Sequence, residues 1–138
     1  MYLIGIDVGS RRIGVAISDA EKKIAFPVEI IDREQNSYGF KKLERIIADR
    51  SVDAFVVGVP YRENGTLGEH GEKVLEYIEG LKRYFKKNVI SWDERFTTRI
   101  AEKVLISDNM RRSKRKRVID KLAAQQILQS YLDYINSR

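Results

Sequence analysis

Two carboxylates stand where apolar strands are predicted to end. Asp7 ends a β-branched strand over residues 2–7, and Glu94 ends the last predicted strand, which begins at Val89. Functional sites of such sheets form at the carboxyl ends of the parallel strands. We therefore expect Asp7 and Glu94 to lie at the same edge, on strands that pair or neighbour each other. Taken singly, such a carboxylate is more often a polar residue that ends a strand than a ligand.

Asp120 contributes a third carboxylate from the last predicted helix, which covers about residues 117–135. At 100° per residue, Ile127 and Tyr131 fall within about 20° of Asp120 around the helix. Asp120 is therefore predicted to lie on the apolar, inward face, where an unpaired carboxylate does not belong. A salt bridge to Arg117 or Lys116 is the structural alternative to a functional role.

Three converging carboxylates favour a hard divalent cation, Mg²⁺ or Mn²⁺, over a softer metal. The chain has no cysteine and a single histidine, which excludes a thiolate-bound zinc site. Asp93 adjoins Glu94, and neighbours along a strand point to opposite faces of a sheet. Only one of the two can join the cluster, and the residues alone leave open which one.

The net charge of +6 arises from one short segment. The chain has 26 basic and 20 acidic residues, and the segment 111–117 holds 6 of the basic ones, so that removing it leaves 20 of each sign. These residues are Arg111, Arg112, Lys114, Arg115, Lys116 and Arg117. Because such a block repels itself, we expect a mobile loop that becomes ordered on nucleic acid. A solvated loop without a partner is the alternative.

The order of predicted elements indicates an α/β fold with a five-stranded mixed sheet. The predicted strands cover residues 2–7, 13–18, 24–31, 53–59 and 89–92. Pro27 places the third strand at a sheet edge or a bulge. The predicted helices cover about residues 37–50, the segment after the loop 60–68, the segment from Thr97 or Thr98 through Ser107, and about 117–135. The result is an antiparallel meander followed by parallel strands, with helices on both faces.

Length and composition indicate one domain over residues 1–138, with enough apolar residues for a single core. No apolar run reaches the ~20 residues of a membrane span. The first residues lack the basic lead and apolar stretch of a signal peptide. We therefore expect a cytoplasmic protein without a membrane partner.

Ordered motifs along the whole chain resemble the YqgF family, which covers pre-16S rRNA nucleases and is also called Holliday-junction-resolvase-like. The motifs are Gly-Ile-Asp-Val-Gly-Ser-Arg-Arg-Ile-Gly-Val-Ala-Ile-Ser-Asp at 5–19, Val-Gly-Val-Pro at 57–60, Asn-Gly-Thr at 64–66, Asp-Glu-Arg-Phe-Thr-Thr at 93–98, Ile-Asp-Lys-Leu-Ala-Ala at 119–124 and Ile-Leu-Gln-Ser-Tyr-Leu-Asp at 127–133. The resemblance implies a ribonuclease H-like fold and a hydrolase that cleaves phosphodiester bonds, with processing of the 5′ end of pre-16S rRNA as its role.

The family's acidic triad maps onto Asp7, Glu94 and Asp120, which the resemblance makes both catalytic residues and metal ligands. By this mapping Glu94, and not Asp93, joins the cluster. The implied mechanism uses two Mg²⁺ or Mn²⁺ ions, one that activates water and one that stabilises the leaving oxygen.

The same mechanism implies that Arg12, Arg95 and the segment 111–117 bind phosphates that flank the cleaved bond. Arg12 has the alternative of bracing the first turn, and Arg95 that of pairing with Asp93.

Three other functions are compatible with these motifs. Resolution of branched DNA is the alternative activity, and it calls for a homodimer because paired cuts need two sites, whereas RNA processing is open to a monomer. Residues 5–14 are also similar to the phosphate loop of actin-like ATPases and sugar kinases, but those enzymes need two lobes and 138 residues supply one. A non-catalytic RNA-binding module is the third.

Overall fold

The computed structural model of the chain describes residues 1–35, 37–97 and 112–137, and for residues 112–121 it describes the backbone alone. The elements in chain order are β1 (Tyr2–Val8), β2 (Arg12–Ser18), β3 (Ala25–Asp32), α1 (Phe40–Ile47), β4 (Val52–Val59), α2 (Glu69–Phe85), β5 (Asn88–Asp93), the 3₁₀ turn η1 (Glu94–Phe96) and α4 (Arg112–Asn136). The helix predicted to follow Thr97 or Thr98 falls on residues outside this description.

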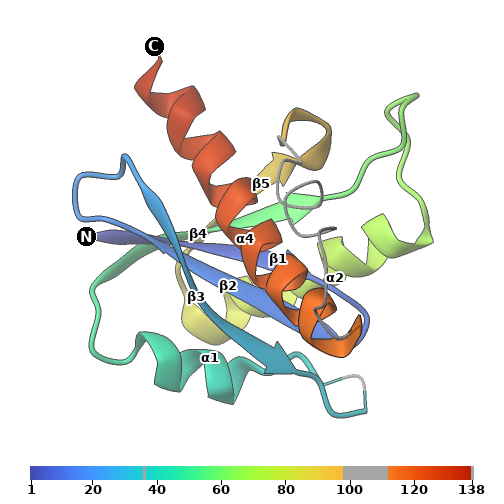
Figure 1. Cartoon of the computed structure of the whole chain (residues 1–138), viewed down its shortest axis with the longest axis horizontal. Helices are drawn as coiled ribbons and strands as arrows, with labels where there is room; N and C mark the ends of the chain where they lie inside the picture. Colours follow the sequence, from blue (N-terminus) through green and yellow to red (C-terminus); the bar gives the residue numbers. More distant parts are fainter. Residues whose placement is uncertain (36, 98–111, 138) are drawn as a thin grey trace.

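The five strands form one mixed sheet in the order β3-β2-β1-β4-β5, as predicted (Figure 1). β1, β2 and β3 pair antiparallel, whereas β4 pairs parallel with both β1 and β5. Pro27 lies on the edge strand β3, where the register against β2 shifts: Val15 faces Glu29 and Ala16 faces Pro27. The expected edge position and bulge are therefore both present. At such a position the missing N–H of proline leaves no hydrogen bond between strands unmade.

Side chains alternate between the two faces of the sheet and form two buried clusters. On one face Ile4 and Ile6 of β1 pack in the cluster that contains Leu43 of α1 and Tyr77 of α2. On the other face Leu3 packs with the apolar side of α4. α4 crosses this second face alone among the described helices (Figure 1). The helices thus cover both faces, as the sequence predicts.

Gly5 brings α4 close to the middle of β1. A Cβ atom at Gly5 would lie 2.6 Å from Cβ of Leu128 and 3.1 Å from the carbonyl oxygen of Ala124. Only a glycine leaves room for the helix at this point. The distance between α4 and β1 is therefore fixed by a residue without a side chain.

The basic segment is helical over its described part, and the predicted loop with a helix start near residue 117 is wrong. α4 begins at Arg112. Arginine and lysine are strong helix formers, and residues 108–120 contain neither glycine nor proline. A like-charge pair one turn apart destabilises a helix by only about 0.2–0.5 kcal/mol. Repulsion of this size does not prevent a helix that continues into the part of α4 packed on the sheet.

None of the helices in the described part of the chain has the length and apolar character of a membrane span.

Candidate active site

Asp7 stands at the carboxyl end of β1 on the face that α4 covers. Leu3 and Gly5, four and two positions earlier, both contact this side: Leu3 lies in the α4 cluster and Gly5 lies under Leu128. Since every second residue of a strand shares a face, Asp7 belongs to the same face. Its side chain is half-buried.

Glu94 reaches the same face from the far side of β4. Trp92 packs in the α4 cluster, and Glu94, two residues later, opens η1. A Cβ atom at Gly58 of β4 would lie 2.9 Å from Cγ of Glu94 and 3.1 Å from its carboxyl carbon. The side chain of Glu94 therefore lies over Gly58.

Gly58 of β4 lies between the strands that carry Asp7 and Glu94. β4 lies between β1 and β5, so the expectation of paired or neighbouring strands is wrong. Two strand spacings separate the strands by about 9–10 Å. Gly58 follows the Ile6–Val57 pair in register and so flanks Asp7, and its missing side chain leaves the space that Glu94 enters. Gly58 is not among the site residues predicted from the sequence, although a glycine inside a β-branched strand signals such a close approach.

Asp120 lies in α4, where the backbone is described and the side chain is not. Further along α4, Cδ1 of Ile127 would lie 2.6 Å from a Cβ atom at Gly58, so the helix passes directly over this glycine. No group of three or more histidine, cysteine, aspartate or glutamate side chains gathers among the described residues. The described part of the site consists of Asp7 and Glu94.

Asp93 is held by its own neighbour, Arg95. Nη2 of Arg95 donates to Oδ2 of Asp93 at 2.7 Å, and the backbone N–H of Arg95 donates to Oδ1 at 3.0 Å, which caps η1. The guanidinium lowers the pKa of Asp93 below its ordinary value. Asp93 pairs in register with Val59, whose side chain belongs to the opposite cluster. Of the two adjacent acids, the geometry brings Glu94 to the α4 face.

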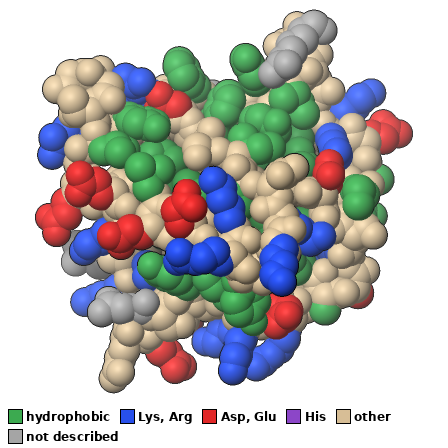
Figure 2. Space-filling view, turned by 180° about the vertical axis from the view of Figure 1, so that it is seen from behind, with side chains coloured by type: hydrophobic (Ala, Val, Ile, Leu, Met, Phe, Trp, Pro, Cys, Tyr) green, Lys and Arg blue, Asp and Glu red, His purple; other side chains and the backbone are tan. Residues whose placement is uncertain are grey.

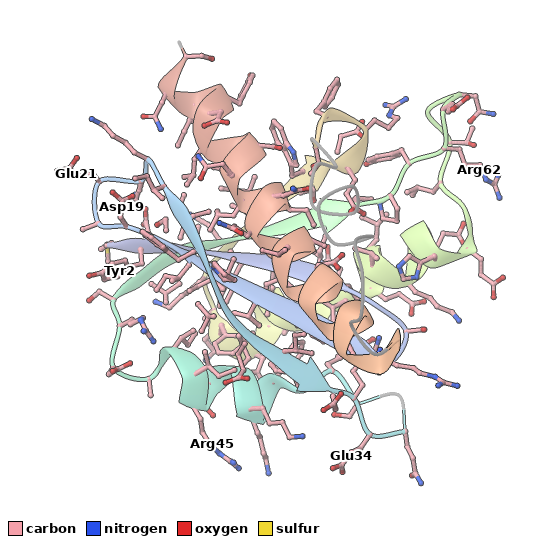
Figure 3. All side chains as sticks on the ribbon, viewed as in Figure 1. Tyr2, Asp19, Glu21, Glu34, Arg45 and Arg62 are labelled. Carbon is pink, nitrogen blue, oxygen red and sulfur yellow. The ribbon has the colours of Figure 1, made fainter. Side chains whose placement is uncertain are left out.

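Arg95 also braces the loop between β4 and α2. Its guanidinium lies 5.6 Å from the ring centroid of Tyr61, and Nη1 lies 3.5 Å and 3.3 Å from the carbonyl oxygens of Arg62 and Glu63, to which it donates. Arg62 itself extends outward from this loop (Figure 3). The pairing of Arg95 with Asp93, kept as an alternative to phosphate binding, is thus present in the structure.

Arg12 starts β2, directly after the turn that follows β1. Its Nε lies 3.6 Å from Oδ1 of Asp32 on β3, and its side chain is 22 % exposed. The carbonyl oxygen of Arg12 accepts a hydrogen bond of 2.8 Å from the N–H of Gly9, which closes the turn. The backbone of Arg12 thus closes this turn, while its guanidinium faces Asp32 of β3. Of the basic residues of segment 111–117, Arg111 lies outside the described residues, and the other five contribute their backbone to α4.

A family model described as "RuvX: Holliday junction resolvase" matches residues 1–134. The chain belongs to this family. Curated relatives named "Putative pre-16S rRNA nuclease" include one from Thermoanaerobacter pseudethanolicus, 48 % identical over 134 residues and covering 96 % of both chains. Another, from Clostridium tetani, is 44 % identical over 138 residues and covers 100 % of both. The resemblance to the YqgF family is confirmed, and with it the class of enzyme, a hydrolase acting on ester bonds.

Two solved structures of Thermus thermophilus RuvC share the fold of this RuvX-family chain. One, in complex with a Holliday junction substrate, has a TM-score of 0.57 at 17 % identity and covers 97 % of this chain and 96 % of its own. The other has a TM-score of 0.56 at 13 % identity, with coverages of 99 % and 97 %. The predicted ribonuclease H-like fold is thereby confirmed.

A methyl group at Gly58 is expected to damage activity more than stability. In Gly58→Ala the new atom meets the movable ends of Ile127 and Glu94, so the free energy of unfolding falls by only about 1 kcal/mol. Glu94 is displaced, however, and a shift of about 1 Å in a catalytic group lowers a rate about a hundredfold. Nuclease assays and urea denaturation of the same preparation measure the two effects.

Gly5→Ala is the matched control. Its methyl group meets Cβ of Leu128 and the backbone of Ala124, which move only if α4 moves. The free energy of unfolding is therefore expected to fall by about 2–3 kcal/mol. Full activity in Gly58→Ala would show that Glu94 does not act from its place over this glycine.

Asp93→Asn is expected to lower the free energy of unfolding by about 0.5–1 kcal/mol at pH 7, because it removes the ion pair with Arg95, whereas the amide oxygen of asparagine can still accept the N–H of Arg95 that caps η1. The pKa of Asp93 is lowered in the folded state, so its stabilisation is present above the unfolded pKa of about 3.9 and is lost as the pH falls through the lower, folded value. Urea denaturation at pH 7 and pH 3 should show the difference between the wild type and the variant shrinking with acid. An equal difference at both pH values would contradict the pairing.

Proposed function

We propose that this chain, as a single domain over residues 1–138, is a metal-dependent nuclease that processes the 5′ end of pre-16S rRNA in the cytoplasm. The observation that carries the proposal is that Glu94 lies over Gly58, which is next to Asp7 in the register of β1 and β4, on the face of the sheet that α4 covers. The relatives that carry the pre-16S rRNA nuclease name match along nearly the whole chain, which supports RNA as the substrate.

The residues at this site fit a hard divalent cation. Carboxylate oxygens are the ligands that Mg²⁺ and Mn²⁺ prefer, and the absence of a side chain at Gly58 lets the carboxylate of Glu94 lie over β4. Asp7, Glu94 and Asp120 are the residues proposed to hold the metal, with two ions bound. When bound, the ions supply an activated water and stabilise the leaving oxygen.

Positive charge at the same edge is proposed to hold the substrate's phosphates. Arg12 follows the turn after β1 and Arg95 follows Glu94, so both stand next to a proposed metal ligand. Arg12 lies 3.6 Å from the carboxylate of Asp32, and Arg95 donates hydrogen bonds to that of Asp93. A phosphate accepts guanidinium hydrogen bonds as a carboxylate does. The basic segment 111–117 adds contacts that carry no base information.

Resolution of branched DNA is the second candidate, because the matching family model carries the description of a Holliday junction resolvase. It differs from RNA processing in the oligomeric state that it requires. Paired cuts in a four-way junction need two active sites, and hence a homodimer, whereas one RNA end needs a single chain.

One experiment separates the candidates. A single preparation is incubated with a labelled pre-16S leader RNA and with a labelled four-way DNA junction, each with Mg²⁺, with Mn²⁺ and with a chelator. The proposal expects metal-dependent cleavage of the RNA, and its loss in Asp7→Asn. Cleavage of the junction alone by a dimer would favour the second candidate. Binding without cleavage under every metal condition would leave a non-catalytic RNA-binding module.

A further inference from the structure

A cavity of about 660 Å³ opens beyond the end of β1, on the face opposite to α4. Its walls come from Val8 and Ser10 at the end of β1, from Arg33 and Tyr38 after β3, and from the first turns of α2. These segments meet on the right of Figure 1, where β1 ends and α2 begins. Val8 directly follows Asp7, so the cavity and the proposed metal site lie at one edge of the sheet, on its two faces.

The inner end of the cavity holds an unsatisfied hydroxyl group. Tyr77 lines the cavity, its side chain is 1 % exposed, and its Oη has no hydrogen-bond partner within the described residues. A buried hydroxyl without a partner is destabilising, and it pairs readily with a polar group that enters. Tyr77 is also held in place, with its ring edge-on to Tyr38 at 5.3 Å. This hydroxyl is therefore a fixed hydrogen-bonding group that lacks a partner among the described residues.

Arg33 is a second lining residue that is held in place by hydrogen bonds. Its Nη1 donates to the carbonyl oxygen of Gly9 at 2.6 Å and its Nε donates to that of Ser37 at 2.8 Å. These bonds use two of the five N–H donors of the guanidinium. The group lies 5.8 Å from the ring centroid of Tyr38. Donors and flat aromatic surface thus lie side by side along the wall.

The charges around the cavity cancel, which argues against a simple anion site. Arg33 and Lys73 are balanced by Glu69 and Glu76, and Lys73 lies 3.9 Å from Glu69. The view from behind shows acidic and basic side chains interspersed over this side of the molecule (Figure 2). A phosphate group here would meet as many carboxylates as cations. A ligand that has hydrogen-bond donors, acceptors and a flat face can contact the cationic, carboxylate and aromatic side chains together.

A nucleobase has this chemistry, because its edge carries donors and acceptors and its face stacks on aromatic rings. We propose that the cavity binds one unpaired nucleobase of the substrate strand, next to the phosphate that is cleaved. The proposal rests on the nuclease function above and deepens it. The strand bends over the end of β1, with the base on the α2 face and the scissile phosphate on the α4 face. The enzyme then requires an unpaired nucleotide beside the cut.

Binding of mononucleotides to the full chain tests the cavity without any cleavage. AMP, GMP, CMP and UMP are titrated in the presence of a chelator and followed by calorimetry, and ribose 5-phosphate serves as the probe without a base. At least one nucleotide is expected to bind about tenfold or more tightly than ribose 5-phosphate. Equal binding of the sugar phosphate, or no binding of any nucleotide, overturns the proposal. Because no metal is present, this result is independent of whether the chain is a nuclease.

Two variants locate the bound base. Tyr77→Phe is expected to weaken nucleotide binding about three- to tenfold, the effect of one hydrogen bond. It should not lower the melting temperature of the free protein, because the hydroxyl has no described partner to lose. Glu76→Gln should also weaken binding, whereas Glu72→Gln, an exposed residue of the same helix outside the cavity, should leave it unchanged. Wild-type affinity in both Tyr77→Phe and Glu76→Gln places the base elsewhere and overturns the proposal.

Discussion

Asp7→Asn is expected to lower the rate of phosphodiester cleavage about a thousandfold while the fold persists. A metal ion at such a site supplies several kcal/mol of transition-state stabilisation, and each 1.36 kcal/mol corresponds to a factor of ten in rate. The amide has the shape of the carboxylate but not its charge, so the half-buried side chain of Asp7 keeps its packing. Single-turnover cleavage of a leader RNA with Mg²⁺ measures the first effect, and thermal unfolding measures the second.

The adjacent acids provide the control for this expectation. Glu94→Gln should match Asp7→Asn, because Glu94 approaches Asp7 over Gly58. Asp93→Asn should be milder, because Asp93 is tied to Arg95 and pairs in register with Val59 of the opposite face. The reverse order of severity would show that the assignment of the two acids is wrong. Most of the wild-type activity in purified Asp7→Asn would refute the nuclease site itself.

The sheet could be predicted from the sequence because its signals are local. The run that became β4 is apolar on both faces, as expected of a central strand covered by helices on each side. Pro27 cannot donate a hydrogen bond to a neighbouring strand, so it was expected on an edge strand or in a bulge. It lies on the edge strand β3, where the register also shifts. The apolar face of α4 followed from helical spacing, and Ile127 is buried there.

The presence of β4 between the strands that carry Asp7 and Glu94 could not be predicted, because it depends on the order of strands that are distant in sequence. No local pattern indicates that β4 enters the sheet between Asp7 and Glu94. Once that order is known, the glycine at position 58 is explained, because any side chain there would collide with Glu94 and Ile127. The start of α4 could not be predicted for a different reason. Local like-charge repulsion favours a loop, whereas the helix is continuous with the part of α4 that packs on the sheet, which is tertiary information.

Neutralising the basic segment is expected to produce the second large effect, on binding. The variant replaces four residues with glutamine: Arg112, Lys114, Arg115 and Lys116. Each phosphate contact contributes ~0.7 to 0.9 to the slope of log K against log salt, so the slope should fall by about three if all four touch phosphate. Affinity should fall similarly for all sequences, because phosphate contacts carry no base information. Fluorescence anisotropy with a labelled RNA over a series of salt concentrations measures both.

A second quadruple variant controls for net charge. Glutamine at Lys41, Lys42, Arg45 and Arg83 also lowers the formal charge from +6 to +2, but these residues lie on α1 and α2, on the sheet face opposite to α4. Its salt slope should change by less than one. If both variants lose the same slope, the binding responds to total charge and not to the segment.

The helical state of the basic segment gives this prediction an additional consequence for stability and turnover. Residues 112–117 form the first turns of α4, where cations oppose the helix dipole, so their replacement should raise the melting temperature of the free protein. Asp120 follows in the same helix, and nucleic acid bound along these turns would hold the position of its backbone. In that case turnover at saturating RNA falls together with affinity, although no catalytic residue has changed. An unchanged salt slope in the α4 variant would mean that this helix end does not contact nucleic acid.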